Sequence, residues 1–124
     1  MNANMIALAA PECVANEREC YSGAVALALM MNPLPEGCAY VEITEPGDGT
    51  LKVGDVARVD LTVDRYLADA AYAVRIDDSE RIRRIQGRRE GLQVFWGNAR
   101  EPFDPARMEI LGVVDARISW EAFT

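Results

Sequence analysis

The sequence contains no histidine, one lysine (Lys52) and only three serines, so most of the residues used in nucleophilic catalysis are missing. Without histidine, Ser-His-Asp and Cys-His catalytic arrangements are excluded, and so is the most frequent general base near neutral pH. A Ser-Lys dyad would need a lysine that loses its proton in a dry pocket. Lys52 stands in a turn between Leu51 and Val53, where we expect its ammonium group to be solvated.

Signals for a metal, a membrane or secretion are also missing. The three cysteines are odd in number, lack CxxC spacing and have no histidine to complete a zinc set. The carboxylates between Glu42 and Asp60 do not have the DxDxDG spacing of a calcium loop. No apolar run approaches the roughly 18 residues of a membrane span, and the N-terminus lacks the basic start of a secretory signal. We therefore expect a cytoplasmic protein with no metal, no cofactor and no membrane contact.

The charge of the chain is acidic overall but basic in one place. The net charge is −7 over 124 residues, which argues against nucleic acid as a partner because phosphate contacts need a basic surface. A cluster of six arginines follows the middle of the chain: Arg75, Arg81, Arg83, Arg84, Arg88 and Arg89. It suits a solvated hairpin surface, a buried ion pair or a nucleic-acid contact. No aromatic residue alternates with these arginines along the chain, which speaks against the last of the three.

Apolar spacing predicts one helix over residues 12–31. Its second half, AVALALMM, is apolar almost all round, so it is either buried on several sides or pressed against a partner; a strand is the alternative for so short an apolar run. Our candidates for a partner surface are Ala24, Leu27, Leu29 and Met30.

The rest of the chain predicts antiparallel strands. In the stretch LKVGDVARVDLTV, apolar residues alternate with polar ones, which is the pattern of a half-buried strand. The expected strands are 39–43, 55–63, 70–76, 81–86, 92–96 and 108–118, with an irregular loop between the last two. The fold class is α+β and mostly β: an N-terminal helical segment over 1–37 and a β domain over 38–124.

Several of these segments together resemble a known family. In order and almost without gaps, TEPGDGTLKVGDVARVD, YAVRIDDSERIRRIQ, LQVFWGNAREPFDP and MEILGVV are similar to the C-terminal peptidase domain of LexA, UmuD and phage repressors. That family's pattern contains GDSMxPxLxxGDxxxVD and a hairpin that ends in VKRL. The resemblance covers about residues 39–118 and implies the LexA/UmuD peptidase-like fold.

The resemblance also implies that the catalytic dyad is lost. The family's nucleophilic serine falls on Pro46, and its general-base lysine falls on Arg83, 37 residues further along the chain. Proline has no hydroxyl group, and an arginine side chain stays protonated in proteins. An arginine that points into the former dyad cleft is costly to bury alone, so we expect a carboxylate from Glu45 or Asp48 to face Arg83.

The family's members dimerise through this domain, so the resemblance implies a catalytically inactive regulatory or protein-interaction module of phage or mobile-element origin. We expect a homodimer that also pairs with a LexA/UmuD-like protein or another repressor of the SOS type. One alternative is a residual self-cleaving peptidase that uses Ser22 or Ser79 with Lys52. Another is a small β-barrel that binds nucleic acid through Arg88 and Arg89.

Overall fold

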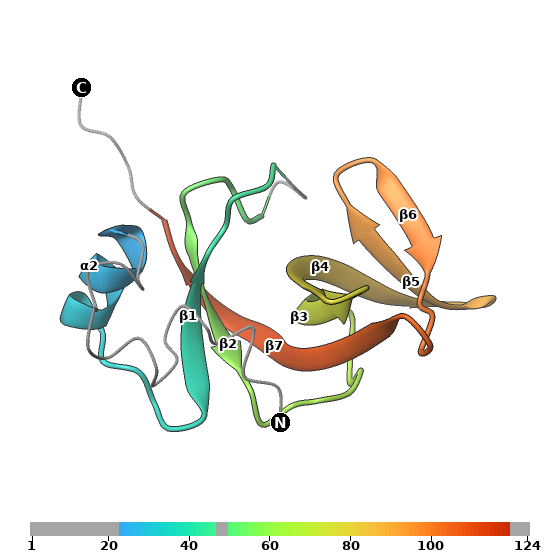
Figure 1. The fold of residues 1–124 in the computed structure, drawn as a ribbon, viewed down its shortest axis with the longest axis horizontal. Helices are drawn as coiled ribbons and strands as arrows, with labels where there is room; N and C mark the ends of the chain where they lie inside the picture. Colours follow the sequence, from blue (N-terminus) through green and yellow to red (C-terminus); the bar gives the residue numbers. More distant parts are fainter. Residues whose placement is uncertain (1–22, 47–49, 120–124) are drawn as a thin grey trace.

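The computed structural model describes residues 23–46 and 50–119, which form one helix and one sheet of seven antiparallel strands (Figure 1). In chain order the elements are α2 (Gly23–Met31), β1 (Cys38–Glu42), β2 (Val56–Asp60), β3 (Ala70–Ile76), β4 (Ser79–Arg88), β5 (Gly91–Trp96), β6 (Ala99–Pro102) and β7 (Met108–Ile118). The strand order in the sheet is β1-β2-β7-β3-β4-β5-β6. The described part is therefore mostly β, as the sequence predicts.

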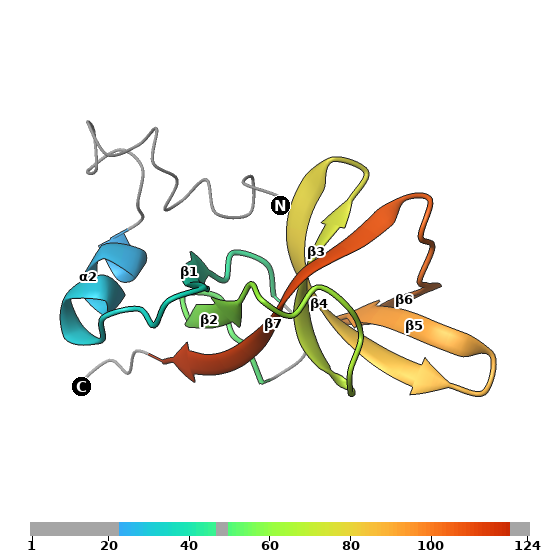
Figure 2. The same cartoon turned by 90° about the horizontal axis from the view of Figure 1, so that it is seen from below.

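The long strand β7 holds the sheet together. It pairs with β2 along one part of its length and with β3 along the other, so it joins the two ends of the molecule (Figures 1 and 2). Its register shifts twice, between Arg58 and Val59 of β2 and between Ala73 and Val74 of β3. Such bulges bend and twist a strand. The hairpins β3–β4 and β5–β6 consequently lie at the end of the molecule away from α2.

Two clusters of buried side chains form the centre of the core. One includes Val59, Ala73, Trp96 and Leu111, and so joins β2, β3, β5 and β7. The other is built around Tyr72 and includes residues of β3, β4, β5 and β7. Tyr72 also accepts hydrogen bonds from two backbone amides of the β2–β3 loop and donates one to a carbonyl there. Ala71 and Ala73 belong to the first cluster and Tyr72 and Val74 to the second, so β3 is buried on both faces and not on the single dry face that the alternation in the sequence predicts.

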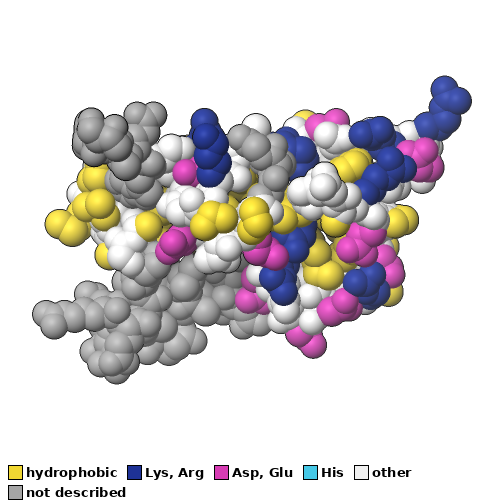
Figure 3. Space-filling model, turned by 90° about the horizontal axis from the view of Figure 1, so that it is seen from above, with side chains coloured by type: hydrophobic (Ala, Val, Ile, Leu, Met, Phe, Trp, Pro, Cys, Tyr) yellow, Lys and Arg dark blue, Asp and Glu magenta, His cyan; other side chains and the backbone are white. Residues whose placement is uncertain are grey.

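Helix α2 confirms the predicted helix over residues 23–31, and the strand alternative for AVALALMM is wrong. Residues 12–22 lie outside the described residues. Val25 and Ala28 are buried against Tyr40 and Val56, so one side of α2 packs on β1 and β2. The other side is exposed, and hydrophobic side chains mark this end of the molecule in Figure 3.

Several predicted boundaries need correction; β4, for example, spans residues 79–88 and not 81–86. The segment after Trp96 is not wholly irregular, because β6 forms a short edge strand against β5. Pro102 is tolerated there since the edge of a sheet does not need its missing N–H group. Strand β2 is shorter than expected and ends at Asp60, whose carboxylate accepts a hydrogen bond from the Thr62 amide at 2.9 Å. This side-chain turn redirects the backbone away from the sheet.

Candidate functional site

The loop that follows β1 is held in place at its root. The Ile43 amide donates to the Asp55 carbonyl at 2.8 Å, and the Gly54 amide donates to the Ile43 carbonyl at 2.9 Å. The buried Asp55 carboxylate accepts a hydrogen bond from the Lys52 amide at 2.9 Å, and Gly54 has a φ of +95°, which favours glycine. The Gly-Asp turn seen in the sequence thus sets the position of Glu45, two residues after Ile43.

Glu45 contacts two arginines of β4. Its Oε1 atom lies 2.9 Å from Nη1 of Arg83, and its Oε2 atom lies 3.1 Å from Nη1 of Arg81. The two arginines are two residues apart on one strand, so they project from the same face. The hydrogen bond from Arg83 lowers the pKa of the Glu45 carboxyl, and the charges of Arg83 and Arg81 lower it further. The ion pair between Arg83 and Glu45 that the sequence predicts is therefore present.

Arg83 is more buried than Arg81. Its side chain is 17% exposed, against 43% for Arg81. Its Nη1 atom also donates to the Ile82 carbonyl at 2.9 Å, and its guanidinium carbon lies 5.6 Å from the centre of the Trp96 ring. The indole N–H of Trp96 is buried and has no hydrogen-bond partner among the described residues. Buried polar groups are normally paired, so the indole N–H of Trp96 is an exception in the core beside Arg83.

Two open pockets flank this ion pair. One has a volume of about 340 Å³ and extends towards the β3–β4 turn, with Asp77 and Ser79 in its wall. The other has a volume of about 290 Å³ and extends towards β5 and β6, with Trp96 in its wall. Glu45, Arg83 and Glu101 line both pockets. The pockets thus meet at the ion pair, and together they form a groove across β4 in which charged side chains of both signs are available to a ligand.

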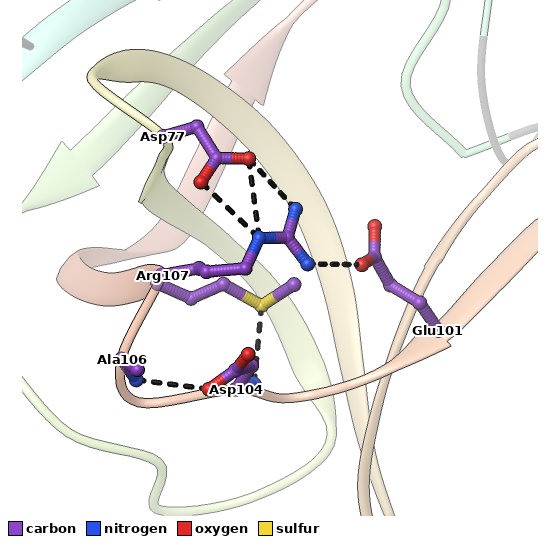
Figure 4. A network of polar contacts seen from close by, with 6 residues as sticks. Asp77, Glu101, Asp104, Ala106 and Arg107 are labelled. Atoms are coloured by element: carbon purple, nitrogen blue, oxygen red, sulfur yellow. Dashed lines mark hydrogen bonds and ion pairs between the residues drawn. The ribbon is translucent and has the colours of Figure 1, made fainter.

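Two carboxylates that line the groove, Asp77 and Glu101, are bridged by Arg107, in the loop between β6 and β7 (Figure 4). Its Nη2 atom lies 2.7 Å from Asp77, in the β3–β4 turn, and its Nη1 atom lies 3.2 Å from Glu101 of β6. The hydrogen bond from Arg107 lowers the pKa of the Asp77 carboxyl. Arg107 therefore connects two hairpins that are joined in the sheet only through β4 and β5, and it maintains the shape of the groove.

The structure brings the two dyad positions of the resemblance into the same site. Pro46 directly follows Glu45, and its carbonyl oxygen lies 4.0 Å from the position of a Cβ atom built on Gly97, in the β5–β6 turn. Asp48 lies outside the described residues. Trp96 and Glu101 belong to this site and were not identified from the sequence. Trp96 sits in an apolar strand pattern, and Glu101 belongs to the segment expected to be irregular.

The alternative dyad is not assembled in the described part of the chain. Lys52 is exposed in the β1–β2 loop, and no hydrogen bond joins it to Ser79 at the start of β4. Ser22 lies outside the described residues. Nor do residues 23–46 and 50–119 contain a group of three or more possible metal-ligating side chains.

The four predicted partner-surface residues of α2 differ in exposure. Leu27 and Met30 are exposed, and Met30 is 81% accessible. Ala24 and Leu29 are half-buried against the cluster around Val25, so they contribute to the core of this chain as well. The described residues include no helix with both the length and the apolar character needed to cross a membrane. Comparison with protein-family models and with curated proteins finds no match for this chain.

Proposed function

We propose that this chain is a LexA/UmuD-like domain that has lost its Ser-Lys dyad and acts as a regulatory protein-interaction module. The observation that supports this most strongly is the ion pair between Glu45 and Arg83. The resemblance assigns the nucleophile to the residue after Glu45 and the general base to Arg83. These two positions are 37 residues apart in the chain; Arg83 lines the groove, and Pro46 directly follows Glu45, which contacts Arg83.

The chemistry of the groove supports binding over catalysis. A guanidinium group does not act as a neutral base, and here it is engaged by a carboxylate. Proline provides no nucleophile. What the groove offers is three arginines and three carboxylates, which suit the backbone and polar side chains of a protein segment.

A second surface for protein contact is the exposed side of α2. Leu27, Met30 and Met31 are exposed large hydrophobic residues within nine residues of chain. Methionine-rich apolar surfaces adapt easily to partners. We assign the homodimer contact to this surface and the contact with a LexA-type or UmuD-type partner to the groove.

The absence of self-cleavage is tested by incubating the purified protein at alkaline pH, where a lysine base of this family is neutral, and following its intact mass. We expect no fragments. Fragments that disappear on Lys52→Gln or Ser79→Ala would show that the chain is a residual peptidase, and the proposal would then be wrong.

The interaction role is tested with Met30→Asp and the matched control Leu67→Asp. Both residues are exposed, Met30 on α2 and Leu67, at 59% accessible, in the β2–β3 loop. Light scattering after gel filtration should give a dimer for the wild type and for Leu67→Asp, and a monomer for Met30→Asp. The wild type should also change the self-cleavage rate of a LexA-type repressor from the same host, and Arg83→Met should weaken this effect. A monomeric wild type without effect on the repressor would contradict the proposal.

A further inference from the structure

The outward face of the strands β4, β5 and β6 has an unusual composition. Register places Arg84 beside Phe95 and Phe95 beside Arg100, and in the next row it places Gln86 beside Gln93 and Gln93 beside Pro102. Because side chains alternate along a strand, these residues share one face with Arg88. We call this surface the Phe95 face; its residues are Arg84, Gln86, Arg88, Gln93, Phe95, Arg100 and Pro102. None of these seven residues has a carboxylate, although the chain as a whole has a net charge of −7. The face borders the groove, because Phe95 and Arg100 also line the pocket that contains Glu45 and Glu101.

At the centre of this face, Phe95 lies between arginines from different strands. The guanidinium carbon of Arg88 is 5.3 Å from the centre of the ring, and that of Arg100 is 5.8 Å from it. Both distances fall within the range of cation–π contacts. The Arg88 side chain is held in this position by a hydrogen bond from Nη2 to Oε1 of Gln86 at 2.7 Å. Along the sequence no aromatic residue alternates with the arginines, which argues against a nucleic-acid contact. In the folded sheet, however, Phe95 lies between Arg88 and Arg100.

The guanidinium groups of Arg88 and Arg100 are available to bind an anionic ligand. Within residues 23–46 and 50–119, neither Arg88 nor Arg100 forms an ion pair. Asp69 is a carboxylate close enough to act on Arg88, and it is engaged elsewhere: it accepts hydrogen bonds from the Tyr66 hydroxyl and from the Gly87 amide. Figure 3 shows Lys and Arg side chains at the end of the molecule away from α2, with hydrophobic and acidic side chains beside them.

We propose that the Phe95 face binds a short segment of single-stranded nucleic acid. A base stacks on the arrangement of Phe95 and its two arginines, while Arg88 and Arg100 contact the phosphates on either side of it. Nucleic-acid bases stack on aromatic rings and on guanidinium planes. Only unpaired bases can stack in this way, because a duplex does not expose the faces of its bases, so we expect a single strand. The neighbouring side-chain amide of Gln86 adds a hydrogen-bond donor beside the ring, whereas Gln93 is only 5% exposed and serves as part of the packing beneath the face. An acidic peptide would form ion pairs with the arginines, but its carboxylates would make no stacking contact with the aromatic ring between them.

The test is fluorescence anisotropy with a labelled oligothymidylate of about 12 nucleotides. Two phosphate contacts predict a slope of about −1.4 for log K against log salt, so affinity should fall about sevenfold between roughly 50 and 200 mM salt. Arg100→Gln should reduce this slope by about half. Phe95→Leu should weaken binding about tenfold and leave the slope unchanged, because stacking releases no counterions.

The matched control is Arg65→Gln, which makes the same change of net charge at an exposed arginine of the β2–β3 loop. Its affinity should stay within about twofold of the wild type. The proposal is wrong if Arg65→Gln weakens binding as much as Arg100→Gln does, if Phe95→Leu has no effect, or if no salt-dependent binding is seen. It is also wrong if a polyglutamate peptide displaces the probe more effectively than unlabelled oligothymidylate. Urea unfolding of each variant establishes that loss of binding is not loss of fold.

Discussion

The ion pair between Arg83 and Glu45 can be tested as an energetic unit by a double-mutant cycle with Arg83→Met and Glu45→Gln. Each single variant also removes other contacts; Arg83→Met, for example, loses the cation–π contact with Trp96. The cycle subtracts these contributions and leaves the coupling energy between the two side chains. The internal comparison is the same cycle with Arg81→Met, since Arg81 contacts the other oxygen of the same carboxylate.

The expected magnitudes follow from exposure. Removing one partner of a fully buried pair costs about 3–5 kcal/mol, whereas exposed pairs contribute about 0.2–1 kcal/mol. The Arg83 side chain is 17% exposed and that of Glu45 is 37% exposed, so solvent screening reduces the coupling well below the buried limit. We expect about 1–2 kcal/mol for Arg83 with Glu45. For the more exposed Arg81 we expect at most about 0.5 kcal/mol.

The assay is urea unfolding at several pH values. The pKa of Glu45 is lower in the folded protein than its ordinary value of 4.5, so the unfolded state binds the proton more tightly. The coupling energy between Arg83 and Glu45 should therefore have its full value above pH 4.5. It should disappear as the pH falls through the pKa of Glu45 in the folded protein. Equal couplings for Arg81 and Arg83, or a coupling that does not decrease in acid, would refute the assignment of Arg83 as the half-buried partner in the groove.

Three further predictions concern individual contacts and turns of the fold. Arg107→Ala should raise the pKa of Asp77 towards its ordinary 3.8, because the hydrogen bond that lowers it is lost; NMR titration of the carboxyl carbon measures this, and an unchanged pKa would contradict the contact. Gly112→Ala should destabilise the protein by about 3 kcal/mol in urea, because the new Cβ would lie 2.6 Å from Val59 Cγ1 and 2.7 Å from the Asp60 carbonyl oxygen. Asp78→Gly should stabilise the protein by about 0.5 kcal/mol, since Asp78 has a φ of +71° in the two-residue β3–β4 turn; a lower melting temperature would argue against that turn.

Much of the secondary structure could be predicted because its causes are local. Short stretches rich in apolar residues predict β3 and β7 with their observed limits, and the turn between β3 and β4 falls where two aspartates follow Ile76. Strand β6 was missed because its four residues include no apolar alternation and end in proline. It forms because β5 offers a free edge, and a free edge is a property of the assembled sheet.

The candidate site was predictable in one part only. The pairing of Glu45 with Arg83 could be anticipated from the resemblance and from the cost of burying a lone charge. The choice of Arg83 over Arg81 as the deeper arginine depends on how β4 is covered by Trp96 and by the loop after β1. Glu101 and Arg107 reach the groove only because the β5–β6 hairpin folds back beside the β3–β4 turn.

The sequence by itself determined which reactive groups are present: without histidine and with a single lysine, the chain has few ways to activate a nucleophile. Only the tertiary structure decided which side chains became neighbours. Phe95 lies eleven residues after Arg84 and five before Arg100, yet the three form one row across β4, β5 and β6. The physical reason is register: a shift of one residue between paired strands would move every side chain to the other face, and register is set by turns, bulges and core packing along the whole sheet.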